Sequence, residues 1–292
     1  MKDTKAMYSA IGLIAVLFWP LSALIVVLTD GINPFLYEFV DKLAIVVCFA
    51  IVFLFRWLVY RENPISDLKV VPLWFYIMGF FGIGIHGLTW VFAVQNAPPE
   101  QATLVIYQWP ILVVVFSAIS LGQKLRLSQI AGCCLGFIGL FVLMKGKGLS
   151  FDSFEFQSGH VYALICALSW SLFSAISARY PFIKQSYLGV IFFFTMLTNG
   201  LIWFFVYGAP VTSFENIMLA GGFGVLVAIS YVCWDLGMKK GDTQFVALSG
   251  LFIPVLATLF LVLAGKAALT ISLALAVVFI FSGIVLAKFG KI

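Results

Sequence analysis

Long, uninterrupted apolar runs are the feature that most limits what this chain can fold into. Runs of roughly 18 to 25 residues recur along the whole sequence, and a helix of this length crosses about 30 Å of hydrocarbon. The strands of a membrane barrel alternate over about ten residues, so such runs exclude a barrel. Hydrophobic residues make up 63% of the 292, and charged residues 10%, against about 45–50% and about 25% in soluble domains. The sequence therefore predicts an all-α polytopic membrane protein.

The apolar runs predict ten transmembrane helices with both termini in the cytoplasm. Cytoplasmic loops collect Lys and Arg, and an N-terminus inside the cell places thirteen of the 17 basic residues on the cytoplasmic side. The expected spans are 7–28, 35–59, 70–95, 101–121, 127–144, 159–178, 187–207, 215–238, 244–264 and 269–288. The expected cytoplasmic basic residues are Lys2, Lys5, Arg56, Arg61, Lys69, Lys124, Arg126, Arg179, Lys184, Lys239, Lys240, Lys288 and Lys291, and those on the other side are Lys42, Lys145, Lys147 and Lys266.

The longest polar interruption, Lys145–Ser158, divides the chain into two sets of five spans. We expect an N-terminal five-helix repeat over 1–146, an extracytoplasmic linker over 147–158 and a C-terminal five-helix repeat over 159–292. Because five is an odd number, the second repeat must enter the membrane upside down. Inverted repeats of this kind are typical of secondary transporters with a binding site near the midplane.

Matching residues at a constant separation support the duplication. The matching residues occur in the same order in both halves, which favours a repeat over coincidence. The pairs 144 residues apart are Trp90 with Trp234, Pro110 with Pro254 and Gly139 with Gly283, and at a separation of 151 the segment Ala15–Trp19 matches Cys166–Trp170.

Several short motifs carry a family resemblance. They are Ile11–Ala15 with Trp19-Pro20, Tyr107-Gln108-Trp109-Pro110, Trp234-Asp235-Leu236-Gly237 with Gly241-Asp242, and Pro254-Val255-Leu256. With ten spans in two inverted halves, the chain resembles the drug/metabolite transporter superfamily in its EamA-type branch, and within that branch the YddG-type aromatic amino-acid exporters. The resemblance covers essentially the whole chain. It implies export of aromatic amino acids, extending to other neutral amino acids and related metabolites, by alternating access.

One face of the third span mixes small, polar and aromatic residues. Gly79, Gly82, His86 and Trp90 recur at three- and four-residue spacing, so they share a helical face. An ionisable group inside a membrane helix is costly to bury and marks a functional site by default. We expect this face to line a cavity, although a neutral His86 that only bonds a neighbouring helix would give the same pattern.

Two prolines predict breaks in the fourth and ninth spans. Pro110 removes a backbone donor and frees the carbonyl of Ile106, and Pro254 does the same in the other half. Freed carbonyls and N–H groups in broken membrane helices can bind the ammonium and carboxylate of an amino acid. The alternative is a kink of steric value only.

We expect substrate to bind near mid-membrane in a cavity rich in indole rings. Such rings stack on flat apolar side chains and attract cations, so they suit aromatic amino acids and organic cations alike. Trp19 and Trp170 fall near mid-membrane, whereas Trp90 and Trp234 lie nearer helix ends. The expected cavity residues are Trp19, Gly82, His86, Trp90, Tyr107, Gln108, Trp170, Tyr231 and Trp234, and the expected helix-break or gating residues are Pro20, Pro110 and Pro254.

The charged residues inside the spans are expected to be structural. Asp235 and Lys239 have the i,i+4 spacing of a local ion pair near the inner end of the eighth span, and Glu38, Asp41 and Lys42 form a similar cluster at the outer end of the second. No carboxylate lies deep within spans one, three, four, six or nine. This absence favours facilitated, substrate-driven transport. His86 could still titrate, so a proton-coupled exporter of drugs or quaternary cations such as paraquat is the alternative.

Other classes of function are not supported. The string Gly82-Ile83-Gly84-Ile85-His86-Gly87 matches G-x-G-x-x-G, but it lies within an expected membrane helix, without the strand that a dinucleotide fold needs. The five cysteines lie in apolar runs and behave as small apolar residues, and His86 and His160 are on different spans, so no enzyme site can be assembled. We expect a monomer in the bacterial inner membrane, with small-molecule substrate and lipid as partners, no nucleic acid and no cofactor. The glycines Gly132, Gly136 and Gly139 predict close helix packing within the monomer.

Overall fold

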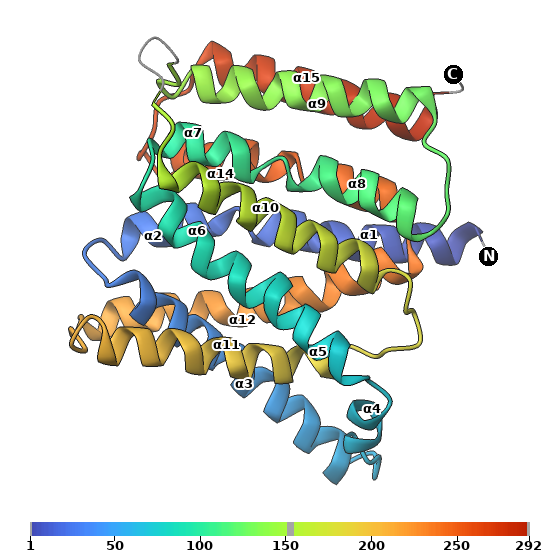
Figure 1. Ribbon diagram of the computed structural model, residues 1–292, viewed down its shortest axis with the longest axis vertical. Helices are drawn as coiled ribbons and strands as arrows, with labels where there is room; N and C mark the ends of the chain where they lie inside the picture. The colour runs from blue at the N-terminus through green and yellow to red at the C-terminus, as the bar shows by residue number, and fades with distance from the viewer. Residues whose placement is uncertain (1, 151–154, 291–292) are drawn as a thin grey trace.

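The computed structural model describes residues 2–150 and 155–290, and this part of the chain is helical without β-strands. Figure 1 shows long helices lying side by side, with the N- and C-terminal ends at the same end of the bundle. Residues 151–154 of the expected linker, and Lys291 of the expected basic set, lie outside the described residues.

The helices before the linker are numbered α1 to α9, with one π-helical segment, η1. Their bounds are α1 Lys2–Phe18, α2 Leu21–Leu28, α3 Pro34–Leu58, α4 Ile65–Lys69, α5 Leu73–Gly79, η1 Phe80–Ile85, α6 His86–Gln95, α7 Pro99–Ile106, α8 Trp109–Ser120 and α9 Leu127–Lys145. Those after it are α10 Ser158–Ser177, α11 Ser186–Phe205, α12 Phe214–Lys240, α13 Thr243–Ser249, α14 Phe252–Leu263 and α15 Ile271–Phe289.

Nine helices in the described residues are long and apolar enough to cross a membrane. They correspond to nine of the ten expected spans, with the first helix beginning at Lys2 rather than at residue 7. The second expected span is α3, which has 25 residues but also carries Glu38, Asp41, Lys42 and Arg56. These four charges keep α3 from having the composition of an ordinary membrane helix.

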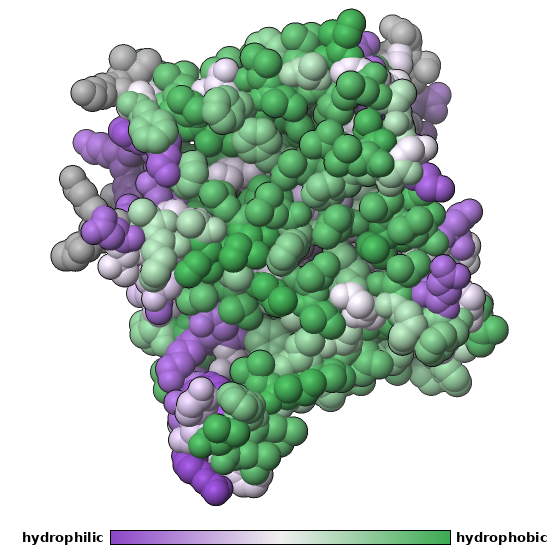
Figure 2. All heavy atoms as spheres, turned by 180° about the vertical axis from the view of Figure 1, so that it is seen from behind, coloured by the Kyte–Doolittle hydropathy of each residue, from purple (hydrophilic) through white to green (hydrophobic). Residues whose placement is uncertain are grey.

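The surface of the bundle matches a membrane setting. Figure 2 shows a broad apolar belt across the middle of the molecule, with hydrophilic side chains gathered along its two edges. Many large apolar side chains are exposed on the described surface; Ile51 of α3, for example, is 60% exposed. In water such a belt would be an aggregation surface, whereas in lipid it is the expected exterior.

Three of the long helices are broken, and the breaks satisfy their own backbone groups. α1 and α2 are separated at Trp19-Pro20, α7 and α8 at Tyr107-Gln108, and α13 and α14 at Gly250-Leu251. At these breaks the backbone makes bonds of the tighter i,i+3 type, as from the N–H of Gln108 to the carbonyl of Val105 at 3.1 Å. Pro110 and Pro254 follow their breaks by two and three residues, so the helices open one turn before the prolines.

The packing of the helices repeats between the halves. α3 packs on α11, α8 on α13, and α9 on α15; each of these pairs joins expected span n of one half to the equivalent span of the other. α1 packs on α12, which correspond to expected spans one and eight, and α6 packs on α10, which correspond to expected spans three and six. A two-fold axis that related the two halves would interchange these two contacts. Each of these five contacts joins an expected span of the first half to an expected span of the second.

Glycines bring α9 and α15 into close contact. A Cβ atom placed on Gly132 would lie 2.5 Å from the carbonyl oxygen of Gly283 and 2.8 Å from the Cβ of Ala287. One placed on Gly139 would lie 2.7 Å from Ile280. The prediction that these glycines serve packing within one chain is confirmed, and the close approach of two backbones is the usual role of small residues between membrane helices.

Replacing Gly132 with alanine should destabilise the protein, because the new methyl group meets a backbone oxygen that cannot move aside. We expect a loss of about 1–3 kcal/mol in the free energy of unfolding, measured by thermal unfolding in detergent. Gly222 of α12 is the matched control, since a Cβ there would meet nothing within 4 Å. G222A should be neutral or stabilising, and equal losses in the two variants would contradict the tight packing described for Gly132.

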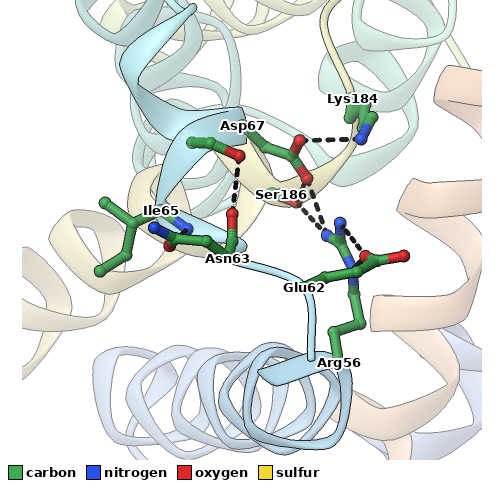
Figure 3. A network of polar contacts seen from close by, with 8 residues as sticks. Arg56, Glu62, Asn63, Ile65, Asp67, Lys184 and Ser186 are labelled. Carbon is green, nitrogen blue, oxygen red and sulfur yellow. Dashed lines mark hydrogen bonds and ion pairs between the residues drawn. The ribbon is translucent and has the colours of Figure 1, made fainter. Parts of the chain in front are cut away.

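A polar network fastens the short helix α4 to its neighbours (Figure 3). Asp67 is the centre: one carboxylate oxygen lies 2.8 Å from Nζ of Lys184, and the other lies 2.8 Å from Nη1 of Arg56. Arg56 also binds Glu62 at 2.7 Å. Burial by itself raises the pKa of Asp67, but the hydrogen bonds and charges of Lys184 and Arg56 outweigh that effect and hold its pKa below the ordinary value.

Because the pKa of Asp67 is lower in the folded protein, its ion pairs add stability above about pH 4 and lose it as the pH falls. D67N should therefore lower stability at neutral pH by about 1–2 kcal/mol and flatten its acid dependence, both measurable as melting temperature from about pH 6 to about pH 3. The exposed Asp3 supplies the control D3N. An unchanged acid profile in D67N would show that other carboxyls govern it.

Candidate functional site

Four tryptophans and one tyrosine meet in the interior of the bundle. We call them the ring cluster; they are Trp19, Trp109, Trp170, Tyr231 and Trp234. Eight ring pairs among them have centroid separations between 5.3 and 6.5 Å. This is the contact range in which aromatic rings attract one another through edge-to-face packing. Trp170 and Trp234 are 4% and 2% exposed, so the cluster is screened from the lipid.

The helix breaks place two of these rings. Trp19 lies at the end of α1 beside the break, and Trp109 is the first residue of α8, next to another break. A Cβ atom on Gly250, in the third break, would come within 2.5 Å of the Trp109 ring. Trp109 therefore lies directly against the break of the other half, and all three backbone breaks are close to the same rings.

Continuous helices hold the remaining rings. Trp170 is on α10, and Tyr231 and Trp234 are three residues apart on α12, so they share a face. The indole Nε1 of Trp234 donates to the Oγ of Ser174 at 2.8 Å. This bond joins α12 to α10 inside the site and satisfies a buried donor.

His86 reaches the cluster from the third expected span. Its ring centroid lies 5.8 Å from that of Trp170, and its Nδ1 lies 2.9 Å from the carbonyl oxygen of Cys166. A nitrogen that binds a carbonyl must carry a hydrogen, so a neutral His86 would have its bare acceptor at Nε2. The π-helical segment η1 ends directly before His86; π-turns widen a helix locally and are frequent at functional sites.

The other expected site residues have different positions. Trp90 is 37% exposed and takes no part in the ring cluster. Of the two ring-bearing residues on the expected face of the third span, His86 reaches the ring cluster and Trp90 does not. Gly82 packs against Phe173. Tyr107 and Gln108 form the break before α8, where Nε2 of Gln108 donates to the carbonyl of Leu104 at 2.8 Å. The three expected break residues, Pro20, Pro110 and Pro254, are all buried.

Sequence reasoning left out three residues of this site. Trp109 belongs to the ring cluster, Cys166 binds His86, and Ser174 binds Trp234. Trp109 could have been found, because it stands between Gln108 and the helix-breaking Pro110. Ser174 and Cys166 give no comparable signal, since a serine or cysteine in an apolar run usually bonds its own helix.

A second polar network lies next to the ring cluster, because its central residue, Asp235, follows Trp234 on α12. Asp235 was expected to form a local ion pair with Lys239 at the membrane boundary. The pair forms, at 2.8 Å, but the two side chains are only 6% and 0% exposed. The carboxylate of Asp235 also accepts hydrogen bonds from Ser177 at 2.9 Å, Gln185 at 2.9 Å and Tyr187 at 2.8 Å. Asp235 therefore ties α10, α11 and α12 together, and its negative charge is fully compensated.

The open space beside the rings is small. A hollow of about 10 Å³, room for about one water molecule, is lined by residues of α10, α11 and α12, among them Trp170, Tyr231 and Trp234. Pockets that enclose a small ligand have about 300–1,000 Å³. The rings touch one another, so they must separate before this site can admit a molecule of amino-acid size.

A second hollow, of about 20 Å³, lies away from the rings, between α9, α13 and α15. Its charged groups already have partners. Arg126 donates to the carbonyl of Ala287 at 2.8 Å, and Nζ of Lys288 lies 3.3 Å from the ring centre of Phe245. This hollow therefore has fewer free groups that could bind a substrate, and the ring cluster is the better candidate site.

In the described part of the chain, nine helices of membrane length surround a buried group of aromatic rings, and broken helices lie beside it, which is the architecture of a polytopic α-helical membrane protein. The chain belongs to the EamA-like transporter family of the drug/metabolite transporter superfamily, and residues 6–145 match that family. It is a transporter and not an enzyme.

Two of the comparisons with known proteins cover nearly the whole chain. The protein is 32% identical over 288 residues to the aromatic amino acid exporter YddG of Ancylobacter novellus, with 96% of each chain covered. It is 22% identical to the exporter of the same name from Escherichia coli over 57% of this chain and 59% of that one. It is 24% identical to the S-adenosylmethionine uptake transporter of Rickettsia prowazekii over 41% and 37%. A solved crystal structure matches with a TM-score of 0.85 and 30% identity, covering 97% of this chain and 96% of its own.

The bond between Trp234 and Ser174 gives a test of how the site is held. W234F and S174A should each cost about 1–2 kcal/mol of stability, because each leaves a buried polar group without its partner. The double variant should cost clearly less than the two losses together, measured by thermal unfolding. The control is S171A, whose hydroxyl bonds two carbonyls of its own helix, that of Ala167 at 2.7 Å and that of Leu168 at 3.1 Å. Simple additivity of the two losses would contradict the contact.

Proposed function

We propose that this protein exports aromatic amino acids, and other neutral amino acids with related metabolites, across the bacterial inner membrane by alternating access. The observation that carries the proposal is the ring cluster, in which four indoles and a phenol meet beside three helix breaks. Flat apolar side chains gain both buried area and favourable ring contacts from such surroundings. The name of the relative from Ancylobacter novellus supports the same substrate class.

The proposal includes a topology of ten spans with both termini cytoplasmic. α3, the second expected span, would complete the ten. Its 25 residues extend to about 37 Å, and it packs against α11 and α12. The repeats would comprise residues 1–146 and 159–292, joined by an extracytoplasmic linker at 147–158. The exchanged helix contacts described above, and the placement of both chain ends at one end of the bundle (Figure 1), support an inverted relation between them.

The mechanism follows from the closed state of the rings. For substrate to enter, the cluster must open toward one side of the membrane while it stays closed toward the other. The breaks at Trp19-Pro20, Tyr107-Gln108 and Gly250-Leu251 are where the backbone can bend with the smallest loss of helical hydrogen bonds. In this proposal Pro20, Pro110 and Pro254 keep those bends in place, and the substrate takes the space between the separated rings.

A second candidate function is transport of organic cations. Ring faces attract cations, and one relative is named an S-adenosylmethionine uptake transporter, whose ligand carries a sulfonium cation. The ring cluster alone does not separate the two classes. A transport assay does.

The decisive measurement is counterflow of radiolabelled phenylalanine into liposomes that contain the purified protein. Phenylalanine, tyrosine and tryptophan should compete for uptake, and methyl viologen should not. W170A and W109A should each reduce uptake about tenfold or more, since each removes several ring contacts, a loss of about 1.4 kcal/mol or more in binding. W90A should have a smaller effect, and F281A, on a residue 59% exposed, should be neutral. Uptake of methyl viologen without phenylalanine uptake would replace the proposal with the cation transporter.

A further inference from the structure

A charged cluster on α3 lies buried next to the ring cluster. Nζ of Lys42 lies 2.7 Å from Oδ2 of Asp41 and 2.7 Å from Oε2 of Glu38. Asp41 is 2% exposed and Lys42 is 9% exposed. Two carboxylates thus share one ammonium group, and the cluster carries one uncompensated negative charge when both acids are ionised.

The cluster also has unused hydrogen-bonding groups. Oδ1 of Asp41 is buried and has no hydrogen-bond partner, and the same holds for the hydroxyl of Tyr37, whose residue is 8% exposed. Tyr37 is close enough to both carboxylates to interact with them electrostatically. A buried, unpaired oxygen and a buried net charge are both costly, and they contrast with Asp235, whose two oxygens have four partners.

The cluster is linked to the ring cluster by two side chains. Tyr231 interacts electrostatically with Lys42 and with both acids, and its ring lies 5.3 Å from Trp19 and 5.5 Å from Trp170. On α6, a Cβ atom at Gly87 would lie 3.5 Å from Oε2 of Glu38. The neighbouring His86 interacts electrostatically with Glu38 and contacts Trp170. Any change in the charge of the cluster is therefore felt at the ring site.

The groups that face Asp41 are few. α3 itself contributes Tyr37, Glu38 and Lys42, and α12 contributes Tyr231. His86 of α6 interacts with Glu38 and Lys42 of the same cluster. α11 also packs on α3, but its titratable residue in the described chain, Tyr187, is bound to Asp235 in the other network.

The size of the space decides what the cluster can bind. A metal ion would need the position between the carboxylates, which Nζ of Lys42 occupies. A substrate ammonium would need an open approach, and Asp41 is almost completely enclosed. A proton needs no space, cancels the net charge and makes Oδ1 of Asp41 a donor instead of an orphaned acceptor.

We propose that Asp41 is a proton-binding carboxylate whose protonation alternates with occupation of the ring site, so that the transporter exchanges one proton for one amino acid. This rests on the proposed transport function. The deprotonated cluster attracts the ammonium group of a substrate in the adjacent ring site, and a proton on Oδ1 removes that attraction. The proton enters from the external water after substrate release. It leaves to the cytoplasm when the next substrate binds, so proton and substrate move in opposite directions.

The proton site is tested first without transport. A pH-difference infrared spectrum of the purified protein should show the C=O stretch of a protonated carboxylic acid. That band should disappear in D41N and persist in E38Q and in E215Q, the last on an exposed residue. A spectrum without the band, or a band lost in E38Q instead of D41N, would overturn the assignment to Asp41.

The coupling is tested by phenylalanine uptake into liposomes with an acidic interior. The gradient should accelerate uptake by the wild type about five- to tenfold. D41N should carry out counterflow more slowly, because its neutral amide lacks the attraction for the ammonium group, and its remaining transport should not respond to the gradient. Wild-type uptake that is indifferent to the gradient, alongside normal counterflow, would overturn the exchange. Absence of any phenylalanine transport together with an intact infrared band would instead remove the proposed substrate and leave the proton site supported.

Discussion

In lipid, no water is available for backbone groups that leave a helix, and this constraint shapes the whole interior of the protein. Three helices break within the bundle, and each break can exist only because other helices cover it. The rings provide much of that cover: Trp109 lies against Gly250, and Trp19 stands at the break of α1. The cluster that forms the candidate site is thus also what makes the irregular backbone tolerable. Site and fold depend on the same contacts.

The sequence predicts most of the architecture because the apolar runs, the glycines and the prolines act locally. The spans, the packing of Gly132 against its neighbour and the breaks near Pro110 and Pro254 follow from hydrophobic length, side-chain size and a missing N–H. What could not be predicted depends on the phase of one helix against another. The π-helical segment before His86 is one such feature, and the outward position of Trp90 is a second. The inclusion of Trp109 in the site is a third, because it requires knowing which rings meet across the halves.

The two buried acidic groups differ in how completely they are paired. Asp235 has four partners: three hydrogen-bond donors and the ammonium group of Lys239. They come from α10, α11, α12 and the residue just before α11, which is the pattern of a fixed structural junction. Asp41 shares its single cation and leaves one oxygen without a partner. From the sequence both appear as a carboxylate near a lysine at helical spacing. Only the surroundings separate a junction from a group that can change its charge.

The glycine contact between α9 and α15 has a consequence for how the halves can move. These helices are the last of each expected half, and at Gly132 and Gly283 the backbone of one closely approaches the backbone of the other. A seam of this kind resists separation, because the close approach gives many van der Waals contacts. It offers little resistance to rotation, because no side chain has to climb over another. In the proposed alternating-access cycle this seam would act as a pivot, about which the helices around the rings would rock.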